Sequence, residues 1–219
     1  MCVTHELNSV VNTKNRPAVI IECFANENFK DVLNLINSKY KEKVIVYAGG
    51  LYERYGIKNL IDGFTMIKNT NVRLWFYGVG SYVNRICEFA ELDSRIEYKG
   101  VVPNDALINI LTRATLLINP RPSHENFTKY TFPSKNMEFM ATGTPLVTTL
   151  LPGIPEDHMP YIYIIEDESK IGIFNILNTT LQKSEEELHA FGSRCKEYTL
   201  ANKNNVMQSK RIIQLIDQN

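Results

Sequence analysis

The chain has 219 residues, of which 44% are hydrophobic and 22% charged, and its 24 basic residues balance 24 acidic ones. This is the composition of a globular protein that is long enough for one large α/β domain with appendages. A formal net charge of zero gives no general attraction to nucleic acid or to an anionic membrane, so an anionic ligand would have to be held by local geometry.

The cysteines indicate neither a metal site nor a disulfide framework. Cys2, Cys23, Cys87 and Cys195 are scattered, without a CxxC pair or a Cys/His cluster at metal-ligand spacing. No run approaches the roughly 18 apolar residues of a membrane span, and the first residues lack the apolar core of a signal peptide. We therefore expect a cytoplasmic protein with reduced thiols and no bound metal.

Strand-like runs alternate with helical stripes along most of the chain. The first run is followed by apolar residues at helical spacing, among them Ile57, Leu60, Ile61 and Phe64. Strands are predicted over residues 44–48, 72–78, 95–100, 115–120, 145–149 and 161–165. Such alternation with short connections predicts a doubly wound parallel sheet, that is, a Rossmann-like α/β fold ending in helices.

The two ends of the chain give weaker patterns. Residues 1–40 are predicted to be a lead-in or linker, in which 17–24 could form an edge strand and 28–36 a short helix. Residues 41–200 are predicted to form the Rossmann-like domain, which turns entirely helical after Asp167 and includes a capping box that begins at Ser184. Residues 201–219 are predicted to form a C-terminal amphipathic helix.

Glycine and polar residues gather where the predicted strands end, which is the edge where parallel sheets bind ligands. Gly49 and Gly50 follow the first strand, and their lack of side chains allows either a close approach by a ligand or simply a tight turn. Gly78 and Gly80 follow the second strand, but Val83 stands where a dinucleotide fingerprint needs a third glycine. A turn is therefore favoured there over an NAD or FAD site.

A short apolar helix is predicted between Ser134 and Gly143. Pro133 keeps Phe132 extended, and Ser134 is expected to cap the helix. The first backbone N–H groups and the helix dipole would then face the ligand edge, and Lys135 would add a positive charge. Phosphate is the natural ligand of such a helix terminus.

Glu138 stands among apolar residues of this helix, one turn after Ser134. No neutralising neighbour is obvious in the sequence, so a ligand or a basic group is expected to compensate the carboxylate. A ribose diol could donate two hydrogen bonds to it, and the alternative is an ion pair with Arg or Lys across the domain. Phosphate beside ribose predicts a nucleotide site.

The segment FPSKNMEFMATGTPLV resembles the donor-binding segment of family 4 glycosyltransferases. VIVYAGGLYERYG, RLWFYGVG, RIEYKGVVPND, LINPRP and LPGIPE fall in the order of that family, and the resemblance covers roughly residues 44–167. It is strongest to the branch that builds bacterial capsule and other surface polysaccharides. The resemblance implies the C-terminal half of a retaining enzyme of GT-B architecture, which transfers a sugar from a nucleotide diphosphate of UDP or GDP type to a glycan or lipid-linked acceptor without a cofactor or an essential metal.

The resemblance also implies roles for individual residues. Glu138 would hold the ribose, the backbone of Val101 and Val102 would meet the base, and Gly49 and Gly50 would lie under the diphosphate. No catalytic residue is assigned. The complete predicted donor site consists of Gly49, Gly50, Arg54, Gly78, Val101, Val102, Tyr130, Phe132, Pro133, Ser134, Lys135 and Glu138.

Two departures from the family concern carboxylates and charge. Tyr130 takes the place of the family's first glutamate, so either Tyr130 or the upstream Glu125 would replace it. The diphosphate-binding arginine and lysine of the family fall on Gly50 and Tyr55. The missing charge could come from Arg54, Lys135 or Arg121.

A third departure concerns the acceptor. Complete enzymes of this type carry an N-terminal acceptor domain of similar size, of which only a short lead-in precedes residue 41 here. We therefore expect little or no transferase activity from this chain alone, and membrane association only through the other half. Its partner would be a separate or removed acceptor domain. The alternative is a non-catalytic or degenerate nucleotide-sugar-binding module, or one subunit of a split enzyme.

Overall fold

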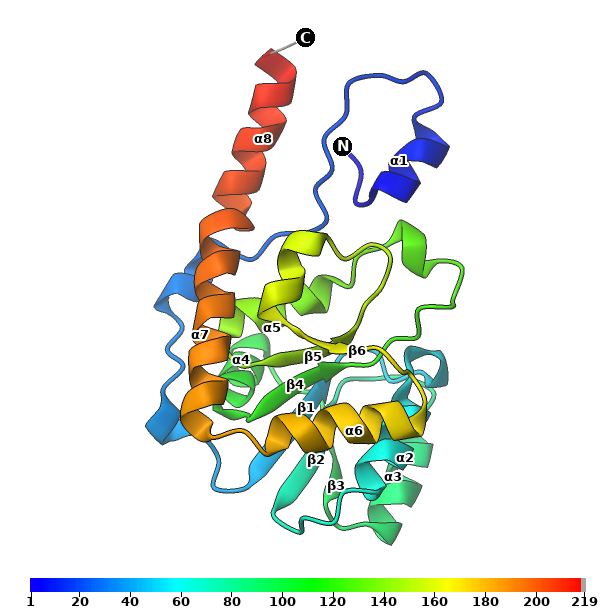
Figure 1. Cartoon of the computed structure of the whole chain (residues 1–219), viewed down its shortest axis with the longest axis vertical. Helices are drawn as coiled ribbons and strands as arrows, with labels where there is room; N and C mark the ends of the chain where they lie inside the picture. The colour runs from blue at the N-terminus through cyan, green and yellow to red at the C-terminus, as the bar shows by residue number, and fades with distance from the viewer. Residues whose placement is uncertain (218–219) are drawn as a thin grey trace.

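Six parallel strands form one sheet in the computed structural model, which describes residues 1–217 (Figure 1). The predicted parallel α/β fold is confirmed. The first and last residues of each predicted strand lie within two residues of the observed bounds. The strands are β1 Lys43–Ala48, β2 Val72–Tyr77, β3 Ile96–Gly100, β4 Leu116–Asn119, β5 Leu146–Thr149 and β6 Tyr163–Ile165.

The order of the strands is β3-β2-β1-β4-β5-β6, so the direction of winding reverses between β1 and β4. These two strands pair directly, with Ile45 opposite Leu116 and Val46 opposite Leu117. The loops that leave the two strands run to opposite faces of the sheet, which opens a crevice at their carboxyl ends. This crevice positions the candidate site.

Helices cover both faces of the sheet. The helices α2 Ile57–Thr65, α3 Val83–Leu92 and α6 Lys170–Leu181 pack in one apolar core. The helices α4 Asn104–Arg113, α5 Ser134–Thr142 and α7 Glu185–Asn202 pack in the other. The predicted stripe of α2 is fully buried in the first core, and each of its large side chains contributes roughly 1.5–3 kcal/mol.

The ends of α5 and α7 show which capping predictions hold. Gly143 ends α5 in the left-handed conformation with a φ of 79°, as a helix-terminating glycine does. Ser134 does not cap this helix, because it is already the first helical residue and Pro133 occupies the N-cap position. The predicted capping box at Ser184 is confirmed, since its side chain accepts from the backbone N–H of Glu187, whose carboxylate accepts from the N–H of Ser184 at 3.0 Å.

The N-terminal α1 His5–Val11 and the C-terminal α8 Asn205–Asp217 lie at the same end of the molecule, beyond the sheet (Figure 1). The strand predicted at 17–24 does not form, because Ile20 makes only an isolated bridge to Cys2. The helix predicted at 28–36 is replaced by short 3₁₀ turns at Glu27–Asp31 and Ile36–Ser38. The predicted helix at 201–219 starts at Asn205, and its last two residues lie outside the described part of the chain.

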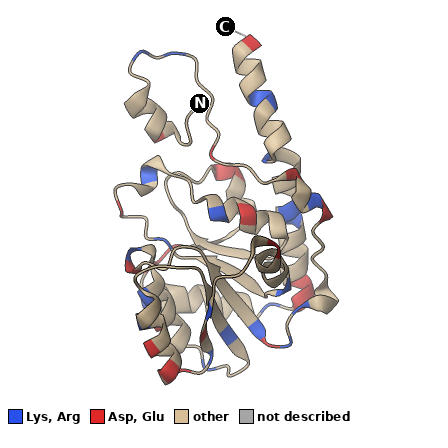
Figure 2. Ribbon diagram, turned by 180° about the vertical axis from the view of Figure 1, so that it is seen from behind, with Lys and Arg blue, Asp and Glu red and all other residues tan. Residues whose placement is uncertain are grey.

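Basic and acidic residues are interspersed over the ribbon rather than gathered by sign (Figure 2). Among residues 1–217, none of the helices combines the length and the apolar content needed to cross a bilayer.

Candidate functional site

A cavity of about 130 Å³ opens between the carboxyl ends of β1 and β4. It brings together Gly49, Gly50 and residues 132–135 of the predicted donor site. Asn119 and Arg121 from the end of β4 complete its polar lining. The full lining consists of Tyr47, Ala48, Gly49, Gly50, Ile118, Asn119, Arg121, Phe132, Pro133, Ser134, Lys135 and Phe139.

The turn after β1 is held in place by Tyr47. Its hydroxyl donates to the carbonyl oxygen of Gly50 at 2.7 Å, and the N–H of Gly49 donates to the carbonyl of Tyr77 at 3.0 Å. Burial raises the pKa of Tyr47 well above its usual range, so the hydroxyl keeps its proton and remains a donor. The two glycines therefore present a fixed stretch of backbone to the cavity.

The helix α5 begins at the opposite wall of the cavity. Pro133, at its N-cap position, supplies no side-chain hydrogen bond to the first turn. The unpaired N–H groups of a helix start and its positive dipole end bind anions, and here they meet the cavity through Ser134 and Lys135.

Glu138 is not the isolated carboxylate that the sequence suggested. The ammonium of Lys135, one turn earlier, forms an ion pair with it, with side chains 41% and 25% exposed, respectively. Glu138 lies outside the cavity at β1 and β4, on an adjoining hollow of about 370 Å³ that is also bordered by Cys23. Ser134 and Lys135 line both spaces, so the carboxylate is one helical turn away from the start of α5.

A circuit of buried polar side chains includes Asn119, which lines the cavity. The amide of Asn119 donates to the side-chain oxygen of Asn136 at 2.6 Å, and Asn136 donates to Thr148 Oγ1 at 3.1 Å. Thr148 donates back to the carbonyl of Asn119 at 2.9 Å. These residues were not among the predicted site residues, although polar side chains at the ends of two neighbouring buried strands were a usable signal.

Two other predicted residues lie outside the lining. Arg54 is exposed and packs against the rings of Tyr52 and Tyr55, with its Cζ atom 5.6 and 5.4 Å from their centroids. Gly78 has a φ of 130°, and a Cβ there would lie 1.9 Å from the carbonyl oxygen of Gly49. Its role is to let two loops pack closely, which agrees with the interpretation of this motif as a turn.

The remaining predicted residues stand farther along the edge. Val101 and Val102 follow β3, where Val101 is 67% exposed and Val102 is half-buried. Tyr130 is half-buried at the end of a 3₁₀ turn, with Lys129 Nζ 5.0 Å from its ring centroid. None of the three lines the cavity at β1 and β4.

Residues 42–180 match the family model described as "Glycosyl transferases group 1". The chain belongs to this family. The matched range contains all six strands and the cavity between β1 and β4.

The fold of this group 1 domain is also that of solved GT-B glycosyltransferases. A sucrose-phosphate synthase from Thermosynechococcus elongatus superposes with a TM-score of 0.75 at 18% identity, over 97% of this chain and 55% of that one. HepE from Anabaena, in complex with UDP and glucose, gives 0.75 at 14% identity, over 100% of this chain and 62% of that one. A glycosyltransferase from Rickettsia africae gives a TM-score of 0.74 at 14% identity, over 91% of this chain and 56% of that one.

The chain thus spans little more than half the length of the structures that it resembles. No match was found among curated proteins.

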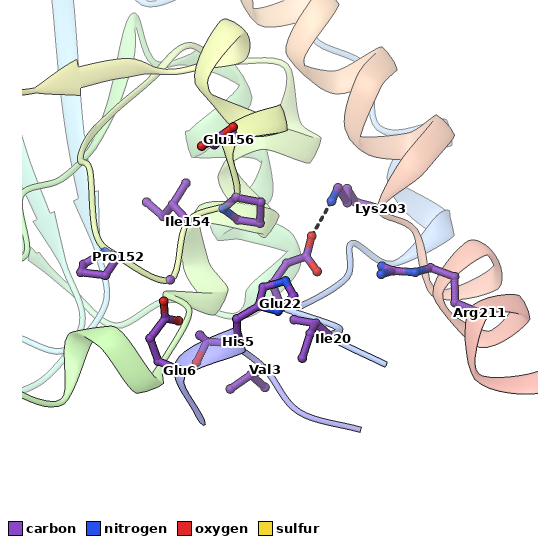
Figure 3. Close-up of a pocket in the computed structure, with 13 residues that line it drawn as sticks. Val3, His5, Glu6, Ile20, Glu22, Pro152, Ile154, Glu156, Lys203 and Arg211 are labelled. Atoms are coloured by element: carbon purple, nitrogen blue, oxygen red, sulfur yellow. Dashed lines mark hydrogen bonds and ion pairs between the residues drawn. The ribbon is translucent and has the colours of Figure 1, made fainter. Parts of the chain in front are cut away.

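A second cavity of the group 1 chain, of about 360 Å³, lies between α1, the loop after β5 and the junction of α7 with α8 (Figure 3). Lys203 forms a buried ion pair with Glu22, and its Nζ lies 2.9 Å from a carboxylate oxygen of Asp157. Arg211, which reaches toward the cavity from α8, donates to Gln208 at 2.7 Å.

His158 is buried behind this ion pair, with 1% of its side chain exposed. Its Nε2 lies 3.8 Å from carboxylate oxygens of both Glu22 and Asp157. Burial and the ammonium of Lys203 lower the pKa of His158 to about 4, so the ring is neutral at pH 7. The charges of this region compensate one another and join segments that are distant in the sequence, which indicates a structural role.

Proposed function

We propose that this chain is the donor-binding half of a retaining glycosyltransferase of family 4. It would bind a nucleotide-diphosphate sugar of UDP or GDP type and pass the sugar to a glycan or lipid-linked acceptor in surface polysaccharide biosynthesis. The observation that supports this most is the cavity at the reversal of strand order, which joins a glycine turn, an uncapped helix start and two cations. A cytoplasmic location is part of the proposal and fits four free cysteines.

The dimensions of the site favour a division of the donor along the edge of the sheet. A cavity of about 130 Å³ is smaller than the roughly 300–1,000 Å³ of pockets that enclose a whole organic ligand. It suits the diphosphate, which would lie between Gly50 and Ser134. The ribose would lie toward Glu138, whose carboxylate would then be shared with Lys135, and the base toward Val101 and Val102.

The proposal separates donor binding from sugar transfer. Transfer needs a second wall that positions the acceptor and excludes water from the reacting bond. We therefore propose that this chain alone has little or no transferase activity and needs an acceptor-binding domain as its partner. Tyr130, at the place of the first family glutamate, favours a second candidate, a non-catalytic nucleotide-sugar-binding module.

Titration calorimetry with UDP, GDP and UDP-glucose tests the proposal. The wild-type chain is expected to bind at least one of them, and Glu138→Gln is expected to weaken binding by about tenfold or more, because a charged acceptor for the ribose is lost. Glu156→Gln is the matched control, since this exposed carboxylate borders the second cavity. The absence of binding at millimolar ligand, or equal affinities for the wild type and Glu138→Gln, would contradict the proposed site.

Complementation separates the two candidates. Addition of an acceptor domain should give sugar transfer if the chain is half of an enzyme. Continued binding without transfer would favour the module instead.

A further inference from the structure

Arg121, at the start of the loop between β4 and α5, has no anionic partner. Its Nε atom is buried without a hydrogen bond, and no ion pair or side-chain hydrogen bond involves this residue within residues 1–217. A guanidinium offers five N–H donors, and such groups are normally paired when they are shielded from water. The side chain lines the cavity beside Gly50 and Ser134. Its donors are therefore available to a ligand in that cavity.

Aromatic rings hold this guanidinium in place. Its Cζ atom lies 4.4 Å from the ring centroid of Tyr55 and 5.9 Å from that of Phe127, which are distances of cation–π contact. Gly50 leaves room for Tyr55, because a Cβ at position 50 would already lie 3.1 Å from ring atoms of Tyr52 and Tyr55. The absence of a side chain at Gly50 thus lets the ring of Tyr55 lie where it contacts the guanidinium of Arg121.

The backbone beside Arg121 is held as well. Gly56 has a φ of 79°, and a Cβ there would lie 2.0 Å from the carbonyl oxygen of Pro120. Glu168, a carboxylate that contacts this loop, accepts from the N–H of Ser123 at 2.9 and 3.1 Å and does not pair with Arg121. The loop is therefore fixed by contacts that do not use the guanidinium of Arg121.

We propose that Arg121 is the main cation for the diphosphate, so that Gly50, Tyr55 and Arg121 form one arrangement that delivers a guanidinium from the loop after β4. The inference rests on the proposed function and chooses among the three cations that the sequence left open. Arg54 is exposed outside the cavity lining, and Lys135 already pairs with Glu138.

The chemistry of the group predicts its selectivity. A guanidinium can donate two parallel hydrogen bonds to neighbouring phosphate oxygens, whereas an ammonium acts as a point charge. The contact with Tyr55, at 4.4 Å from Cζ to the ring centroid, restrains the guanidinium before the ligand arrives, which reduces the entropy lost on binding. Diphosphates should therefore depend on Arg121 more strongly than monophosphates do.

Calorimetry with UDP, UMP and inorganic pyrophosphate on the full chain tests this assignment. Arg121→Gln is expected to weaken UDP binding by about tenfold or more and pyrophosphate binding at least as much, because charge-assisted hydrogen bonds are lost. The binding of UMP, which carries a single phosphate, should be weakened less by the same substitution. Arg54→Gln makes the same change at the other guanidinium that contacts Tyr55. It should change UDP affinity by less than about threefold, because that guanidinium is exposed to water.

Arg121→Lys serves as a second variant, since it keeps the charge without the fork, and it should lie between the wild type and Arg121→Gln. Urea midpoints of each variant show whether the fold is kept. The assignment is overturned if Arg121→Gln and Arg121→Lys bind UDP like the wild type, or if Arg54→Gln loses as much. Those results would leave the proposed function intact. Failure of the wild type to bind any of the three anions would contradict the proposed function and, with it, this assignment.

Discussion

Two of the cavities described above treat charge in opposite ways. Between β1 and β4, the guanidinium of Arg121 has no anionic partner within the described residues. Beside α1 and α8, the ammonium of Lys203 is matched by the carboxylates of Glu22 and Asp157. A charge left unpaired at a cavity indicates a ligand, and a charge compensated inside the protein indicates structure. The cavity beside α1 and α8, although the larger of these two, is therefore the weaker candidate for a binding site.

Removal of the Glu22 carboxylate should produce the largest loss of stability, because it breaks the buried ion pair with Lys203 beside α1 and α8. Glu22→Ala leaves Lys203 with only the more exposed Asp157, and we expect the free energy of unfolding to fall by roughly 3 kcal/mol, as for other broken buried ion pairs. Urea denaturation measures the loss. UDP affinity of the folded variant should stay unchanged.

The paired variant Glu22→Met with Lys203→Met is the control for this change. It removes both charges and should cost less than Glu22→Ala alone. An equal cost would show that packing, rather than charge, holds this region.

Acid should act on the same region through His158. Its pKa of about 4 in the folded chain lies below the ordinary value of 6.5, so the unfolded chain binds the proton first as the pH falls. The stabilisation that comes from the neutral ring of His158 should be fully present above about pH 6.5. The free energy of unfolding should then fall toward pH 4, by up to roughly 3 kcal/mol. Urea midpoints between pH 7 and pH 4 measure this decline.

The charged groups that face His158 are Glu22, Asp157 and Lys203. His158→Phe should flatten the pH profile. His124→Gln, the same kind of group on an exposed loop, should leave it unchanged. A profile unaltered by His158→Phe would assign the acid response to other groups.

The smallest expected effect compares two serines at helix starts. Ser184→Ala removes a capping box from α7 and should lower the free energy of unfolding by about 1 kcal/mol. Ser134→Ala removes no cap from α5 and should change it by less than about 0.5 kcal/mol. Thermal or urea unfolding measures both, and a larger cost at Ser134 would contradict the capping pattern of the structure.

The sheet could be predicted because its information is local. Runs such as Val44–Ala48 are buried on both sides and end in glycine, so strand and turn are visible within a few residues. The lead-in could not be predicted in the same way. Ala25 donates to the carbonyl of Lys203 at 2.9 Å and accepts from the N–H of Asn205 at 3.1 Å, and partners so distant in sequence leave no periodic signal.

The candidate site was predicted in part for the same reason. The glycine turn and the start of α5 are visible as motifs, and both reach the cavity. The pair of Lys135 with Glu138 could have been foreseen from their spacing of three residues. The contact of Arg121 with Tyr55 joins loops after two different strands, and only the strand order makes them neighbours.

The hydrogen-bonded circuit of Asn119, Asn136 and Thr148 ties β4, α5 and β5 together at the wall of the cavity that Asn119 lines. Displacing any one of these groups breaks hydrogen bonds of the other two, so a deformation of this wall of the cavity costs free energy. Opening and closing around a nucleotide would therefore be confined to the segment 120–133 above it. That hinge-like asymmetry would appear as fast amide hydrogen exchange in the upper segment beside slow exchange in the strands below.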